Sequence, residues 1–179
     1  MAKQKTEAEE VQIPLVQWIR RYYPGTIIIA NPFSEIQIHG SENYRKTVLM
    51  KAQAMGWRKE TPDIILLKNN GQYCGLALEL KRTGSDPLRI PRGKTKPWVQ
   101  ESTSKEAERV RGQAIALAEL YAQGYLATFA TGLDAAKFAV EQYFKQETGG
   151  HLSFFAISDS DSGPFQKTYL VPHLTPISR

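Results

Sequence analysis

Apolar side chains recur at two spacings along this chain, and each spacing predicts a type of element. Near the start they repeat every three or four residues, which is typical of a helix with one buried face: Val11, Leu15, Trp18, Ile19 and Tyr22. Tyr23-Pro24-Gly25 ends this helix. A strand is predicted over 26–30 and a second helix over 41–55. Between them, Ile36 and Ile38 indicate either a brief strand or an ordered loop.

Two apolar runs, 64–67 and 73–78, flank the polar segment 68–72 with its Asn-Gly pair. This order predicts two antiparallel strands joined by a turn. Side chains alternate along a strand, so the second run divides into two faces. Leu76, Leu78 and Leu80 are expected to point into a core, whereas Gly75, Ala77, Glu79 and Lys81 share the other face.

Asp63 opens the first of these strands, and Glu79 and Lys81 close the second. Carboxylates are ligands that suit Mg²⁺ or Mn²⁺, which keep coordination positions for water and phosphate oxygens. A metal held there polarises a phosphate and lowers the pKa of a bound water. Lys81 can then position the attacking hydroxide or stabilise the transition state. The pattern favours phosphodiester hydrolysis. Its alternative is an exposed charged pair beside a turn Asp, which strand ends carry routinely.

The downstream sequence predicts two more helices and a strand. Thr103-Ser104-Lys105-Glu106 resembles a capping box that opens a helix running to about residue 123. Gln113 lies at the margin of its apolar stripe, which comprises Val110, Ala114, Leu117 and Tyr121. Gly124 ends the helix, and 125–130 is a strand. Asp134 is expected to cap a last helix ending near residue 146.

The order of these elements predicts an α/β sandwich with a mixed central sheet. Beyond the glycines at 149 and 150, strands are expected at 151–157 and 168–171. These strands can extend the sheet, cover one of its faces or pair across a dimer, and the pattern does not choose among the three.

The residues quoted so far resemble a known family, the virus-type replication-repair nuclease (VRR-NUC) domain of the PD-(D/E)xK nuclease superfamily. The resemblance spans about residues 7–144. Its motifs are Glu9-Glu10, Asn31-Pro32, Met55-Gly56-Trp57, Pro62-Asp63, Glu79-Leu80-Lys81, Gln113 and Gly124-Tyr125. It implies a PD-(D/E)xK nuclease-like α/β/α sandwich, with a nuclease domain at 1–148 and a C-terminal extension at 149–179.

The resemblance also implies the site. The expected metal ligands are Glu10, Asp63, Glu79 and Leu80, with Glu9 as the alternative to Glu10. The expected catalytic residues are Asp63, Glu79, Lys81 and Gln113. The cofactor would be Mg²⁺ or Mn²⁺, and the substrate branched or Holliday-junction-like DNA, in a stand-alone protein of phage or mobile-element type. Because a four-way junction has two symmetric strands to cut, a homodimer is expected.

The chain departs from the family pattern in three places. Lys59-Glu60-Thr61 stand where members usually carry a small Gly before Pro-Asp, and Val110 stands where many carry Ser. The connection over 82–104 is longer than in compact members. None of these departures touches an expected metal ligand.

Charge favours a polyanionic partner. The 179 residues carry a net charge of +5, with a pI near 9.3, and 41% are hydrophobic, as in one soluble globular domain. Cations gather between residues 81 and 111, next to the expected metal site. The residues expected to contact DNA are Arg82, Arg89, Arg92, Lys94, Lys96 and Trp98. Trp98 would stack on an unpaired base or wedge a junction; alternatively, it anchors a solvated basic loop.

Other chemistries find little support. Cys74 is the single cysteine, which excludes a disulfide framework and the usual zinc sites. The three histidines lack metal-ligand spacing, and no phosphate-binding glycine loop or serine nucleophile motif is present. No apolar run reaches membrane-spanning length and the polar start lacks a signal-peptide core, so a cytoplasmic location is expected.

The sequence therefore predicts a metal-dependent endonuclease that acts on DNA phosphodiester bonds. A restriction-type duplex endonuclease and a noncatalytic DNA-binding module on the same fold are the alternatives. The restriction-type interpretation is weakened because the pattern shows no separate recognition domain. The binding module would gain nothing from carboxylates that face phosphates.

Overall fold

The computed structural model describes residues 6–31, 40–58, 60–85, 87, 91–94, 97–145, 151–158 and 168–175. Helices and strands are mixed along the chain. In chain order they are the π-helix η1 (Ala8–Gln12), α1 (Ile13–Tyr22), β1 (Ile27–Ala30), α2 (Glu42–Ala54), β2 (Ile64–Leu67), β3 (Gly75–Lys81), α3 (Trp98–Glu101), α4 (Lys105–Ala122), β4 (Tyr125–Thr131), α5 (Gly132–Lys145), β5 (His151–Ser158) and β6 (Thr168–Thr175).

The strands form one mixed sheet in the order β1-β2-β3-β4-β6-β5. The predicted antiparallel hairpin of β2 and β3 is confirmed, with Ile64 opposite Leu78 and Leu66 opposite Leu76. β3 then pairs with β4 in parallel along its whole length, which requires a crossover, and α4 lies in that crossover. β6 joins β4 at Phe129 and His173, and β5 pairs with β6 at the edge.

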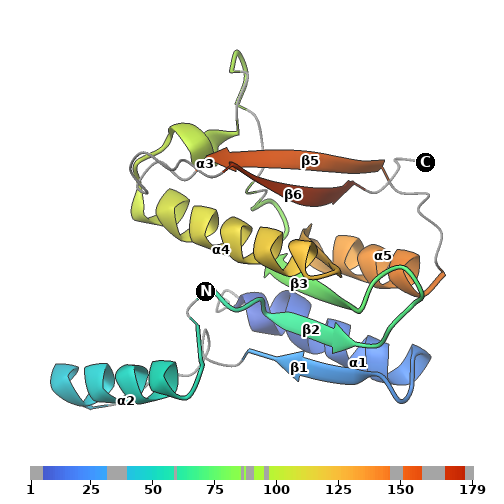
Figure 1. Ribbon diagram of the computed structural model, residues 1–179, viewed down its shortest axis with the longest axis horizontal. Coiled ribbons are helices and arrows are strands. Elements are labelled where there is room, and N and C mark those ends of the chain that lie inside the picture. The colour runs from blue at the N-terminus through green and yellow to red at the C-terminus, as the bar shows by residue number, and fades with distance from the viewer. Residues whose placement is uncertain are drawn as a thin grey trace, which may run out of the picture.

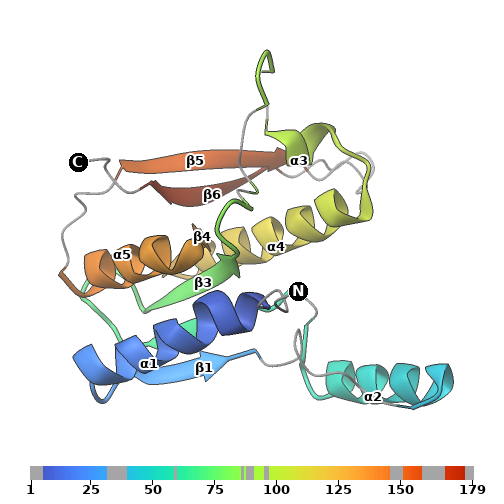
Figure 2. The ribbon, with the colours of Figure 1, turned by 180° about the vertical axis from the view of Figure 1, so that it is seen from behind.

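Helices cover both faces of the sheet, so the predicted α/β/α sandwich with a mixed sheet is confirmed (Figures 1 and 2). On one face, Val11, Leu15 and Ile19 pack with α5 against the leucines of β3. On the other face, α3 and α4 pack against Ala77 and the β4 residues Ala127 and Phe129. Every residue of β3 is buried, and its alternation between the two cores follows the predicted faces.

The predicted ends of α4 are confirmed, whereas the boundaries of two other helices differ from the prediction. The N-cap of α4 is Ser104, whose hydroxyl accepts a hydrogen bond from the Ala107 amide at 3.2 Å. Gly124 ends α4 at a φ of 85°, as predicted. Asp134 lies in the first turn of α5 and is not its cap, because that helix begins at Gly132. The helix α3 occupies part of a stretch predicted as loop.

Other predictions meet the structure only in part. Ile36 and Ile38 lie outside the described residues. The two C-terminal strands extend the sheet, one of the three alternatives left open by the pattern. The domain division at residue 148 stays a prediction. In the described part of the chain, no helix is long and apolar enough to span a bilayer.

Candidate active site

A cavity of about 530 Å³ opens between the α4 face of the sheet, the start of the chain and α2. Its walls combine ionisable and amide side chains with a few apolar ones. The lining residues are Glu7, Asn31, Leu49, Gln53, Trp57, Glu60, Thr61, Asp63, Glu79, Arg109 and Gln113. Three of the four predicted catalytic residues therefore border one space, and Lys81 contacts two of them.

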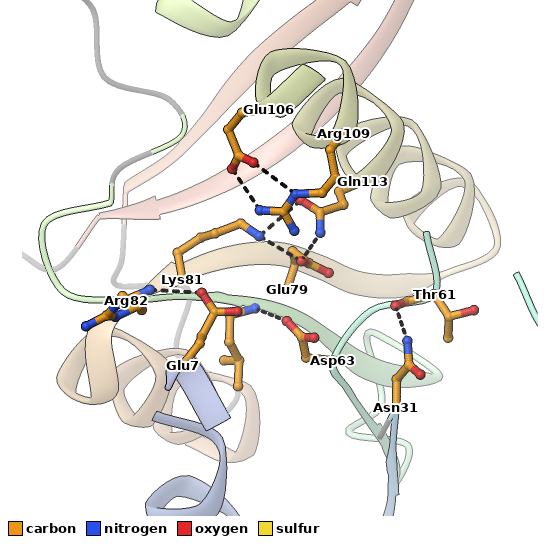
Figure 3. A network of polar contacts seen from close by, with 11 residues as sticks. Glu7, Asn31, Thr61, Asp63, Glu79, Lys81, Arg82, Glu106, Arg109 and Gln113 are labelled. Atoms are coloured by element: carbon orange, nitrogen blue, oxygen red, sulfur yellow. Dashed lines mark hydrogen bonds and ion pairs between the residues drawn. The ribbon is translucent and has the colours of Figure 1, made fainter. Parts of the chain in front are cut away.

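Glu79, Lys81 and Gln113 form a buried polar network at the end of β3 (Figure 3). The Lys81 ammonium donates to Glu79 Oε1 at 2.8 Å and to Gln113 Oε1 at 3.0 Å. The Gln113 amide donates in turn to the same Glu79 oxygen. The three side chains are 2%, 4% and 9% exposed, respectively, so water competes little for these bonds. The network fixes the Glu79 carboxylate from two elements, β3 and α4.

Asp63 is held from three sides. Its Oδ2 accepts a hydrogen bond from the Leu80 amide at 2.8 Å, which ties it to β3. Its carbonyl accepts from the Asn31 amide at 2.9 Å and from the Gln12 side chain at 3.3 Å. The side chain of Leu80 lies in the apolar core, so only the backbone of this predicted ligand faces the site.

The structure brings Glu7 to the cavity, whereas the predicted ligand Glu10 does not line it. Glu7 lines the cavity, and its Oε2 accepts from the Arg82 amide at 3.1 Å. Glu10 instead accepts from the Thr83 amide at 3.2 Å and pairs with Arg82 Nε at 3.4 Å. Glu9, the alternative, caps the helix start by accepting from the Thr6 amide at 2.8 Å, while Thr6 Oγ1 accepts from the Glu9 amide. Glu9 and Glu10 are thus engaged elsewhere.

A signal for Glu7 was present in the pattern. Glu7 lies four residues before Val11, and Val11, Leu15 and Ile19 form the fully buried stripe of the first helix. The inward face therefore continues through Glu7, whereas Glu9 and Glu10 lie off it. A carboxylate on an otherwise apolar face is a better candidate for a site than carboxylates that lie off that face.

Arg109 is a second cavity residue that the sequence did not single out as catalytic. It lies one helical turn before Gln113 on α4, and Glu106 holds its guanidinium with bonds of 2.7 and 3.2 Å. The hydrogen bond with Glu106 is the largest cause that raises the Arg109 pKa, and Glu79 and Glu7 add to it. A permanent positive charge thus faces the carboxylates across the cavity.

Burial and mutual repulsion raise the pKa of the carboxyl groups of the site. Burial is the largest cause that raises the pKa of Glu79, to about 8, and the charge of Asp63 adds to it, while Lys81 opposes both. Burial likewise raises the pKa of Asp63, against the Leu80 amide and Lys81. Burial and Asp63 raise the pKa of Glu7. The site concentrates negative charge that its own cations do not fully compensate.

This donor set fits a divalent cation. Two buried carboxylates that repel each other, with a third nearby, are relieved by a cation, and carboxylate oxygens are the ligands that Mg²⁺ and Mn²⁺ prefer. Within the ranges that the structure describes, no three His, Cys, Asp or Glu side chains form a closed cluster around a metal position. An open site of two carboxylates is typical of Mg²⁺, which keeps several waters.

The predicted DNA-binding residues are placed unevenly. Arg82 is partly buried in its ion pair with Glu10. Arg92 and Lys94 are exposed, whereas Arg89 and Lys96 lie outside the described residues. Trp98 begins α3, packs against the α4-side core and lines a separate cavity of about 260 Å³ that also contains Lys81. Arg111, from the same basic region, donates to the carbonyls of Val99 and Ser102 and fastens α3 to α4.

Comparisons with known proteins bear on the fold. No protein-family model matches the chain, and no curated protein matches its sequence. One solved structure, described as a VRR_NUC domain protein, is similar with a TM-score of 0.52 and 23% identity. The similar region covers 80% of this chain and 92% of that one. The chain therefore has the fold of a VRR_NUC domain protein, in agreement with the family resemblance of its motifs.

Proposed function

We propose that this protein is a Mg²⁺- or Mn²⁺-dependent DNA endonuclease whose active site is the cavity around Asp63 and Glu79. The observation that carries the proposal is the buried network of Glu79, Lys81 and Gln113 beside the Asp63 carboxylate. Burying so many ionisable groups costs stability, which a merely structural strand end would not require. The VRR_NUC fold of the similar structure supports the same function.

Asp63, Glu79, the Leu80 carbonyl and Glu7 are the groups that would hold the metal. When bound, the metal supplies Lewis acidity toward a phosphate oxygen and a water of lowered pKa. Lys81 and Gln113 keep the Glu79 carboxylate oriented, and the Leu80 amide does the same for Asp63. Arg109 places a cation across the cavity, where it can bind a nonbridging phosphate oxygen.

The substrate proposed is branched, junction-like DNA, cut by a homodimer. A two-fold dimer would present two of these sites to the two symmetric strands of a four-way junction. Both edges of the sheet, β1 and β5, are strands that a second copy can pair with.

The test is a metal titration with four-way and linear duplex DNA that compares the wild type with Asp63→Asn. We expect Mg²⁺- or Mn²⁺-dependent cleavage, faster on the junction, and abolished by Asp63→Asn or by a chelator. Glu141→Gln, which removes a charge from α5 on the opposite face of the sheet, serves as control. Cleavage by Asp63→Asn at the wild-type rate would refute the assignment of the site. Equal rates on both DNAs, or a monomer on junction DNA in light scattering, would refute the preferred substrate or the dimer.

A further inference from the structure

Helix α2 lies apart from the body of the protein. Ala52 is the single buried residue among its 13, and Figures 1 and 2 both show the helix projecting beside the sheet and its covering helices. A helix of this length is marginal by itself in water, and α2 buries little surface that would stabilise it. Its retention as an exposed arm points to a contact outside the chain.

The base of this arm belongs to the active-site cavity. Leu49 and Gln53 on α2 and Trp57 just after it line the same cavity of about 530 Å³ as Asp63 and Glu79. The rest of α2 extends away from that wall. At 1.5 Å per residue the helix is about 20 Å long. A ligand that occupies the cavity and continues along the surface on this side would follow α2.

The exposed surface of α2 is positively charged. Arg45, Lys46 and Lys51 are exposed, and Glu42 is its one acidic residue. Lys46 pairs with Glu42 at 2.8 Å. Arg45 and Lys51 make no ion pair with a carboxylate in the part of the chain that the structure describes. Two exposed cations on α2 are thus available for an anionic partner.

We infer that α2 is a DNA-binding arm, in which Arg45 and Lys51 contact backbone phosphates of the duplex that flanks the cleavage position. This inference rests on the proposed function and assigns a substrate contact to a surface outside the site. With a rise of 3.4 Å per base pair, the helix follows at most about six base pairs. Such contacts give affinity without reading sequence.

A second copy of the chain is the competing occupant, because α2 also exposes Tyr44 at 56% and Met50 at 68%. In a two-fold dimer built on α2, however, two copies of a helix with three cations and one carboxylate would meet. Like charges brought together across an interface are unfavourable. The charge of the arm favours a phosphate backbone over a second arm.

The test measures binding to duplex DNA in EDTA, where no cleavage occurs, over a series of salt concentrations. The variant is Arg45→Gln/Lys51→Gln, since Gln keeps helix propensity. Its matched control is Arg20→Gln/Arg21→Gln, the same loss of charge at the end of α1 that lies away from α2 in both views. We expect the slope of log affinity against log salt to fall in magnitude by about 1.8, or about 0.9 per phosphate. Near 0.1 M salt, affinity should weaken at least about tenfold.

Three outcomes separate the possibilities. The assignment of α2 as a DNA-binding arm is overturned if the salt slope is unchanged in Arg45→Gln/Lys51→Gln. It is also overturned if the Arg20→Gln/Arg21→Gln control reduces the slope equally. If Tyr44→Ser/Met50→Ser abolishes a dimer while Arg45→Gln/Lys51→Gln leaves the salt slope of DNA binding unchanged, α2 contacts a second copy. The DNA-binding assignment is then overturned. If the wild type cleaves no DNA with either metal but the slope falls as expected, the proposed nuclease activity fails while the arm is supported.

Discussion

The two faces of β3 have opposite physical properties although they belong to one strand. Toward α1 and α5, Leu76, Leu78 and Leu80 pack into an apolar core. Toward α4, Glu79 and Lys81 are buried just as deeply, but among ionisable groups. Burial of apolar surface stabilises the fold, whereas burial of charge costs free energy unless partners compensate it. The leucine positions of β3 therefore contribute to stability, and the charged positions contribute to the proposed active site. Each role can be tested by substitution.

The largest expected effect is on cleavage, through the α4 face. Glu79→Gln keeps the size of the side chain but removes a carboxylate from the proposed metal site. We expect single-turnover cleavage of junction DNA in Mg²⁺ to slow at least about 1000-fold, or about 4 kcal/mol in the barrier. A variant that cleaves within tenfold of the wild type would show that this face is not catalytic.

The second effect is on stability, through the apolar face. Leu78→Ala leaves a cavity among fully buried side chains and should lower the free energy of unfolding by about 3 kcal/mol, measured by urea denaturation. Its folded fraction should cleave at close to the wild-type rate. If the cleavage rate per folded molecule fell as steeply as in Glu79→Gln, the apolar face and the α4 face would not have separate roles in stability and catalysis.

The third effect is a pH dependence of stability to which Glu79 should contribute most, because its pKa is the most strongly raised in the site. The pKa of Glu79 is about 8 in the folded protein against 4.5 as its ordinary value, so the folded state holds an extra proton between these pH values. The free energy of unfolding of the metal-free protein should therefore fall as pH rises from about 5 to about 8. Relative to Glu79→Gln, the loss should be at least about 1 kcal/mol. Parallel curves for the two proteins would contradict this prediction.

The smallest effect distinguishes two carboxylates of the first helical segment. Glu7→Gln should raise the Mg²⁺ concentration needed for half-maximal cleavage about tenfold, or about 1.4 kcal/mol, because Glu7 lines the cavity. Glu10→Gln should change it less than about twofold, since Glu10 contacts Arg82 and Thr83 instead. The reverse ranking would restore Glu10 as the ligand.

Features with a strict local period were predictable from the sequence. The alternation of leucines with Glu79 and Lys81 defined both faces of β3, and Gly124 marked the end of α4. These outcomes depend on backbone geometry that each segment imposes on itself. The fold class followed from the order of such segments.

Features that depend on contacts between segments distant in the sequence were not predictable in the same way. Glu7 lines the cavity, whereas Glu9 forms a local cap with Thr6 and Glu10 pairs with Arg82. The position of Arg82 depends on packing of the helix against β3. The sequence also predicted α2 as a helix without revealing how little of it is buried. Its apolar side chains do not form a single stripe, and periodicity names no packing partner.

The parallel pairing of β3 with β4 has a consequence for the order in which the protein folds. The β2–β3 hairpin is local and can form early, yet by itself it brings Asp63 and Glu79 together before Gln113 or Arg109 arrives on the crossover helix. Lys81 on the same hairpin can already pair with Glu79, whereas the Gln113 amide and the Arg109 guanidinium come only with the crossover helix. The polar network is therefore complete only when contacts distant in the sequence have formed, which ties assembly of the site to completion of the fold.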